Sequence, residues 1–333
     1  MDTKVLRQKV LDLAIRGKLV PQDPNDEPAS VLLERIRQQK QQMVKDGKLK
    51  AKDIKNDTII FVSEDNLHYE KFADGSVKCI EDEIPFELPD GWAWSRLGAV
   101  AEAIGDGDHQ PPPQTSFGVP FLVISNVSGG RLSFENTRFV SKEYFSQLPE
   151  TRKPRNGDLL FTVTGSYGIP VLIDSDDKFC FQRHIAIVRP CTISNRYLYV
   201  ILGSSYVKSI CDAKATGTAQ KTVGLATLRE LLIPVAPYKE QMQIYAQTQD
   251  ALSIVDSVSS DKEDLLNIIE SAKAKILDLA IRGQLVPQDP TDEPASVLLE
   301  RIRAEKEELI KQGKIKRDKK ESVIFRGEDN SYY

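Results

Sequence analysis

The sequence predicts an α+β protein, in which one mixed α/β domain is joined to a long coiled-coil helix and flanked by repeated helical regions. Three observations predict this fold: a segment duplicated near both ends of the 333-residue chain, a long stretch without proline or glycine that carries heptads, and a middle segment of short β-branched and aromatic runs. At 40% hydrophobic and 28% charged residues, the composition excludes a disordered tail. We expect five segments, at residues 1–50, 51–85, 86–239, 240–283 and 284–333.

The internal repeat is the clearest feature of the chain. Residues 10–40, here termed copy 1, and residues 276–306, copy 2, are related by an offset of 266 and differ at only five of 31 positions, namely 10, 18, 25, 38 and 39. In each copy an apolar-periodic helix ends at Gly17 or Gly283, and a proline-rich turn follows. A second helix is expected at 29–45 and at 295–311, so the predicted unit is a helical hairpin followed by a lysine-rich connector.

The stretch from Glu240 to Arg282 contains no proline and no glycine, and its apolar residues alternate in steps of three and four. This spacing is typical of a coiled-coil seam, and a helix of this length is a rod of roughly 65 Å. The seam consists of Ala251, Val255, Val258, Leu265, Ile269, Ala272, Ile276 and Leu279, with Lys262 in one further position. Its partner is expected to be either residues 3–16 of this chain or the same helix of a second chain. The alternative is a long core helix of a bundle.

The middle segment, from about Phe86 to Tyr238, changes to short runs punctuated by turns. Its predicted strands are 121–125, 158–164, 170–174, 179–181 and 184–188. Its predicted helices are 141–147, 194–205 and 205–213. The segment is therefore expected to be a mixed α/β domain.

Charge and cysteine content narrow the possible functions. The net charge is −4, whereas residues 90–240 carry 16 basic and 14 acidic side chains, so this mildly basic segment permits a polyanionic partner. The four cysteines form no CxxC pair, and no apolar run approaches the 20 or so residues of a membrane span. We expect a reduced, cytoplasmic protein without a membrane partner.

The sequence lacks the common motifs of catalysis and metal binding. The sequence holds no GxxxxGK[ST] loop, no HExxH and no nucleophile elbow, and its three histidines are isolated. The turn Gly165-Ser166-Tyr167-Gly168 could present backbone N–H groups to a phosphate, although a plain β-turn explains it equally well. We therefore expect no catalytic residues, no bound metal and no bound cofactor in this chain.

The order of several weaker motifs, together with the repeat, resembles the DNA-specificity subunit of Type I restriction-modification enzymes along essentially the whole chain. The motifs are Glu83–Trp92, Trp94, Leu97-Gly98, Asp106–His109, Pro111–Pro113, Gly118–Leu122, Asn126, Gly157–Phe161, Gly165–Gly168, Gly217-Thr218-Ala219-Gln220, Ile233-Pro234 and Glu240-Gln241. The resemblance implies that residues 86–239 are a target-recognition domain that reads half of a bipartite site on double-stranded DNA. It also implies that methylation and cleavage belong to partners, a methyltransferase that uses S-adenosylmethionine and a restriction motor subunit.

A full-length member of that family would continue into a second recognition domain, whereas copy 2 here is followed by no such domain. Two interpretations are open, a natural half-length subunit or part of a longer protein. If half-length chains pair through their long helices, the two identical domains are expected to read an interrupted palindrome.

DNA sequence is read by side chains on loops held by a rigid scaffold, while other contacts to phosphates set the position. The residues predicted to read bases are His109, Gln110, Arg183, His184 and Gln220. Those predicted to contact phosphates or support the loops are Ser166, Tyr167, Thr218 and Lys221, and Gly107 and Gly217 are expected to let the backbone approach the duplex. These residues could also have purely structural roles. Arg183 and His184 could lie at a solvated strand edge, and Gln220 and Lys221 could simply form a turn.

A different class of function also fits the sequence, namely a non-catalytic coiled-coil scaffold whose central domain binds a peptide or small ligand. The two classes differ in one property. A specificity subunit binds duplex DNA with a steep salt dependence, and a scaffold does not.

Overall fold

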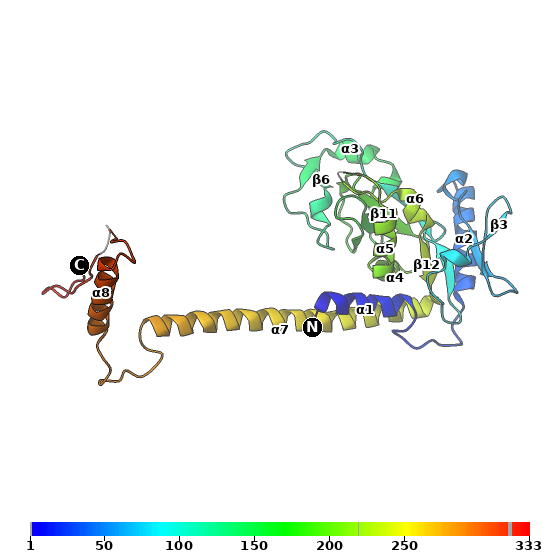
Figure 1. The fold of residues 1–333 in the computed structure, drawn as a ribbon. Coiled ribbons are helices and arrows are strands. Elements are labelled where there is room, and N and C mark those ends of the chain that lie inside the picture. The colour runs from blue at the N-terminus through cyan, green and yellow to red at the C-terminus, as the bar shows by residue number, and fades with distance from the viewer. Residues whose placement is uncertain (1, 219, 319–321) are drawn as a thin grey trace. The chain divides into compact units, whose positions relative to one another are not determined.

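The computed structural model describes residues 2–218, 220–318 and 322–333, and the chain divides into two compact units, residues 1–262 and 263–333 (Figure 1). Helices and strands are mixed, which confirms the α+β class. The helices are α1 (Thr3–Ile15), α2 (Ala29–Lys45), α3 (Lys142–Gln147), α4 (Asn195–Leu202), α5 (Ser205–Lys214), α6 (Leu225–Glu230), α7 (Tyr238–Ile281) and α8 (Ala295–Lys311). The strands are β1 (Ile59–Val62), β2 (His68–Lys71), β3 (Val77–Cys79), β4 (Ala93–Arg96), β5 (Ala101–Asp106), β6 (Val119–Leu122), β7 (Arg138–Val140), β8 (Leu159–Thr162), β9 (Pro170–Leu172), β10 (Cys180–Phe181), β11 (Ile185–Pro190) and β12 (Leu232–Val235).

The centre of the first unit is an antiparallel sheet in the order β5-β11-β8-β9. Successive side chains of a strand point to opposite faces, and here both faces are covered. Leu159 and Phe161 pack with the helices α4 and α5, whereas Leu160 packs with Leu122 and Phe181 of the neighbouring sheet β10-β6-β7. Burial on both faces explains why these strands are continuous apolar runs in the sequence.

The predicted strands and helices of the middle segment all have counterparts in the structure, with ends that differ by a few residues. The strand predicted at 121–125 is only partly a strand, because β6 ends at Leu122 and residues 124–126 form a 3-10 turn. Ser141, predicted as the first residue of a helix, is the N-cap of α3, and its hydroxyl accepts a hydrogen bond from the Tyr144 amide.

Other strands were not predicted. The pair β4-β12 places Trp94 opposite Pro234, and a proline is tolerated there because the sheet has two strands and so offers unpaired edges. The range 51–85, expected as a connector, contains the sheet β1-β2-β3. The Arg96 guanidinium joins that sheet to β4, since it bonds to the carboxylates of Glu70 (2.6 Å) and Glu83 (2.8 Å).

Copy 1 is part of the core of the first unit. Leu11, Ile15, Leu32 and Ile36 are buried in the same apolar cluster as the central sheet. Helix α1 lies along α7 (Figure 1) and runs antiparallel to it. Thr3 faces Ser259 with hydroxyls 3.3 Å apart, and further along α1 the Arg7 guanidinium pairs with Asp256. In this unit the partner of the long helix is therefore α1 of the same chain.

The second unit contains the last part of α7 and α8. Helix α7 is one unbroken helix, and α2 and α8 have the bounds predicted for them. The seam residues Leu265, Ile269 and Ile276 are exposed. Beyond α8, Phe325 stacks on Tyr333 at 5.9 Å, the same local geometry as Phe61 on Tyr69 at 6.0 Å in the first unit. The two copies thus have the same local structure in different surroundings.

Candidate functional site

Four loops meet at one edge of the central sheet. Because β11 is antiparallel to both β5 and β8, it begins where they end: Ala186 pairs with Asp106, and Ile185 pairs with Thr162. The residues that follow β5 and β8 and those that precede β11 are therefore neighbours. We define the loop face as residues 107–110, 164–168, 182–184, 216–218 and 220–222.

Backbone hydrogen bonds fix the loops to one another. The Arg183 amide donates to the Asp108 carbonyl (3.0 Å), and the Val163 amide donates to the His184 carbonyl (2.9 Å). The Gly165 amide donates to the Lys221 carbonyl (3.1 Å). The structure thus brings together the residues singled out from the sequence, although they are up to 114 positions apart. Ala219 of the Gly217–Gln220 motif lies outside the described residues.

The two glycines of the prediction have roles within the fold. A Cβ atom at Gly107 would lie 1.9 Å from the Phe181 carbonyl oxygen. Gly217 has a φ of +111°, and its Cβ would lie 2.4 Å from the Gln220 carbonyl oxygen. Both positions require glycine because the chain packs against itself there. An approach of these two residues to a DNA backbone stays a prediction.

The Gly165–Gly168 turn is held from two sides. The Thr162 hydroxyl donates to the Ser166 carbonyl (2.7 Å), and the Ser166 side chain is exposed. The Tyr167 hydroxyl donates to Asp212 (2.8 Å), and this bond raises the pKa of Tyr167. Lys208 bonds to the same carboxylate (2.6 Å) and lies 4.0 Å from the Tyr167 ring centroid, which makes a cation–π contact. The turn is therefore a fixed structure.

Lys208 and Asp212 were missed by the sequence prediction. Their spacing of four residues on α5 is a signal of a helical pair, but it does not indicate which loop they contact. Together with Gln8, Gly203 and the turn, Lys208 lines a cavity of about 480 Å³ beside the loop face.

His109 and Gln110 are exposed at the other end of the loop face. The His109 Nε2 atom lies 2.7 Å from Asp106, which also lies 3.8 Å from Arg152. Arg152 in addition contacts buried Asp108 at 3.4 Å. Arg152 is thus a further cation near the loop face, and no motif singled it out.

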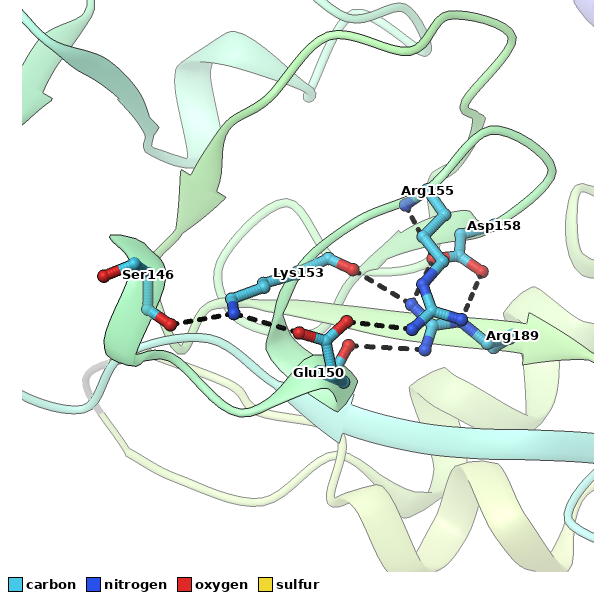
Figure 2. Close-up of polar contacts among 6 residues, drawn as sticks. All are labelled: Ser146, Glu150, Lys153, Arg155, Asp158 and Arg189. Atoms are coloured by element: carbon cyan, nitrogen blue, oxygen red, sulfur yellow. Dashed lines mark hydrogen bonds and ion pairs between the residues drawn. The ribbon is translucent and has the colours of Figure 1, made fainter. Parts of the chain in front are cut away.

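The segment that carries Arg152 is anchored by the network in Figure 2. The Arg189 guanidinium on β11 makes two bonds to buried Asp158, at 2.9 and 2.8 Å, and donates to the carbonyls of Glu150 and Lys153. The Glu150 carboxylate accepts bonds from Lys153 and Arg155 at 2.9 Å each. The network is satisfied internally and holds residues 150–158 against the sheet.

The loop face carries charges of both signs, and some of its cations have no carboxylate partner among the described residues. Arg183 and Lys221 of the loop face are exposed, as is Lys214 at the end of α5, and within the part of the chain that the structure describes none of the three has a carboxylate within 4 Å. His184 is half-buried, and burial and the Arg183 charge lower its pKa, so it is neutral near pH 7. Free guanidinium, ammonium, amide and imidazole groups on one surface can both bind phosphates and hydrogen-bond to base edges.

The described residues form neither a metal-binding cluster nor a membrane-spanning helix. Among residues 2–218, 220–318 and 322–333, no three histidine, cysteine, aspartate or glutamate side chains are grouped so that they could hold a metal ion. Within the same residues, no helix has both the length and the apolar character needed to span a bilayer.

Comparison with known proteins links this chain to one family. A family model described as the Type I restriction modification DNA specificity domain matches residues 89–267. The chain is 32% identical to the EcoAI specificity subunit of Escherichia coli over 95% of its length and 58% of that protein, and 30% identical to the EcoEI specificity subunit of the same species over 95% and 57%. A solved structure of the HsdS subunit from Thermoanaerobacter tengcongensis is 22% identical with a TM-score of 0.42, over 77% of this chain and 57% of that one. The chain thus spans somewhat over half the length of these relatives.

Proposed function

Because the chain belongs to the Type I restriction-modification DNA specificity family, we propose that residues 86–239 form a target-recognition domain that reads one half of a bipartite site on double-stranded DNA. The loop face carries this proposal. It places four loops on one edge of a rigid sheet, fixes them to one another through the backbone, and leaves polar and cationic side chains exposed. Loops on a rigid scaffold are the usual carriers of recognition.

The side chains divide into two groups by their chemistry. Arg183 can donate two bonds to a guanine, and Gln110 and Gln220 can bond to both edge atoms of an adenine. Lys221 offers a mobile point charge suited to a phosphate, as does Lys214. His109 and His184 are further base-reading candidates, while Ser166, Tyr167 and Thr218 would support the loops or contact phosphates.

The chemistry of restriction and modification is assigned in this proposal to other subunits. A methyltransferase that uses S-adenosylmethionine would dock on copies 1 and 2 and on α7, and a restriction motor subunit would join it, in the cytoplasm. The near identity of copies 1 and 2 supports two equivalent docking surfaces for two identical methyltransferase subunits. This chain would bind no cofactor and would act as the non-catalytic specificity subunit.

Two copies of the chain would pair through the exposed seam of α7, which includes Leu265, Ile269 and Ile276. An apolar helical stripe of this length is stable when a second helix covers it. Because a twofold axis relates the two recognition domains, the site they read would be an interrupted palindrome. Footprints that showed two different half-sites under a homogeneous preparation would contradict this part of the proposal.

The first experiment maps methylated positions in DNA from cells that carry this chain and its methyltransferase subunit. A single bipartite sequence is the expected result. Duplexes of that sequence then give binding constants by fluorescence anisotropy over a range of salt concentrations. Binding that does not weaken with salt would contradict DNA recognition and favour the scaffold.

Two adjacent residues test the division between base and phosphate contacts. Gln220→Ala is expected to cost about 1–3 kcal/mol of binding free energy and to relax specificity at one base pair. Lys221→Ala is expected to weaken binding to all sequences alike and to reduce the slope of log K against log salt by about 1. Equal losses from both, without any change in sequence preference, would refute the division.

A further inference from the structure

Copy 1 covers a defined surface of the first unit, here termed the seat, which comprises Pro89, Gly91, Trp92, Gly98 and Glu240. The Ala29 amide donates to the Gly91 carbonyl (2.8 Å), and the Lys40 ammonium donates to the Gly98 carbonyl (2.8 Å).

The seat also receives the turn between the two helices of copy 1. Gly17 lies so close to it that an added Cβ would be 2.4 Å from the Pro89 Cγ atom. The Gln22 amide and the Trp92 indole N–H both donate to the Glu240 carboxylate, at 3.1 and 2.9 Å.

Copy 2 has nearly the same residues, but its apolar side chains are exposed instead of packed on such a surface. Leu32 is 1% exposed and its counterpart Leu298 is 46% exposed, while Ile15 is fully buried and its counterpart Ile281 is 86% exposed. The internal geometry is nevertheless the same, since Gln22 donates to the Gly17 carbonyl at 2.7 Å and Gln288 donates to the Gly283 carbonyl at 2.9 Å. None of the five positions that differ between the copies is fully buried in copy 1.

We propose that copy 2 of one chain occupies the seat on the first unit of a second copy of this chain, in place of that chain's own copy 1. The occupant follows from the structure, because copy 1 already shows how this set of side chains fits the seat. The proposal rests on the pairing of two copies proposed above but not on DNA recognition.

The contacts of α1 predict how the two long helices would meet. Copy 2 begins within α7, so residues 269 and 273 correspond to Thr3 and Arg7 of α1. Ile269 would then lie beside the partner subunit's Ser259. Lys273 would pair with Asp256 of the partner subunit, as Arg7 does within the chain.

This pairing is antiparallel and therefore reciprocal. When the end of α7 of one chain lies on the start of α7 of the other, the reverse contact forms at the same time, and a closed twofold dimer results. The exposed apolar residues Leu265, Ile269 and Ile276 would be covered. The exchange replaces one set of buried contacts by an almost identical set, so the additional burial along α7 favours it and high protein concentration promotes it.

A disulfide trap tests the seat directly. Gln39 of copy 1 hydrogen-bonds to Thr192 of the first unit, and the counterpart of Gln39 in copy 2 is Glu305. In the chain of residues 1–333 with exposed Cys79 changed to serine, Thr192→Cys combined with Glu305→Cys is expected to form a disulfide between two chains. The matched control, Thr192→Cys with Gln39→Cys, forms one within a chain. Non-reducing electrophoresis after mild oxidation distinguishes the two.

Two further substitutions decide the result. Leu298→Asp in copy 2 changes an exposed residue, so the chain still folds, and it is expected to abolish the interchain disulfide. Leu32→Asp in copy 1 vacates the seat and is expected to increase that disulfide several-fold in chains that circular dichroism shows to be folded. An absent interchain band, or one unaffected by Leu298→Asp, would overturn the proposal. If sedimentation still shows a dimer in that case, pairing stands and only the seat assignment fails.

Discussion

Copies 1 and 2 share 26 of 31 residues and the same helical hairpin, yet copy 1 is buried in a core and copy 2 is exposed. The difference between them is the surface each one meets. Copy 1 lies on the seat, against Trp92 and Glu240, whereas the side chains of copy 2 meet solvent in the single chain. The comparison shows that the sequence of the copies is enough to form the helical hairpin, whereas the burial of its apolar side chains depends on the surface beside it.

The largest expected difference between the copies is in the stability of matched core substitutions. Leu32→Ala removes buried methyl groups and is expected to cost about 2–5 kcal/mol of unfolding free energy. Leu298→Ala changes an exposed side chain and is expected to lie within about 0.5 kcal/mol of the parent. Urea unfolding at a protein concentration low enough to prevent pairing gives both values. Similar losses for the two variants would show that copy 2 is covered in the free chain.

A smaller difference is expected at the turn glycines. Gly17 and Gly283 have φ of +64° and +65°, so alanine costs about 1–2 kcal/mol at either position. At Gly17 the added Cβ would also meet the Pro89 ring at 2.4 Å, whereas at Gly283 the nearest atom is the Gln288 amide nitrogen at 3.1 Å, on a flexible side chain. Thermal unfolding of Gly17→Ala is therefore expected at a lower temperature than that of Gly283→Ala. Equal midpoints would mean that the copy 1 turn can leave the seat without penalty.

The smallest expected difference depends on pH. Burial raises the pKa of the Glu240 carboxyl, against the opposing hydrogen bonds from Gln22 and Trp92. Its contribution to stability is therefore fully present below its unfolded pKa of about 4.3 and is lost as pH rises through the folded pKa. The unfolding midpoint of Glu240→Gln, relative to the parent, is expected to rise between pH 4 and pH 7. Gln288→Ala in copy 2 is the control and should show no such trend.

Local features of the fold could be predicted because they depend on neighbouring residues. The bounds of α2 and α8 follow from apolar spacing between a proline and a glycine, and the continuity of α7 follows from the absence of both residues over 43 positions. The strands β8 and β11 were found because burial on both faces makes them continuous apolar runs.

Features set by distant partners could not be predicted in the same way. Strand β5 has Ile104 as its single β-branched residue, and β12 contains Pro234, so neither resembles a strand until its partner is known. The candidate readers were named from motifs, but their convergence depends on the antiparallel pairing of β11 with β5 and β8. Lys208 and Arg152 lie beside the loop face because they contact Tyr167 and Asp108, which are far away from them in the sequence.

The separation of the loop face from the two cores has an evolutionary consequence. The side chains of β8 and nearly all those of β11 are buried, whereas Gln110, Arg183, Gln220 and Lys221 in the loops are exposed. Surface substitutions of this kind usually change stability by less than about 0.5 kcal/mol. If these residues read DNA as proposed, a lineage with this architecture can change its sequence preference one loop residue at a time, while the sheet and helices that hold the loops stay folded.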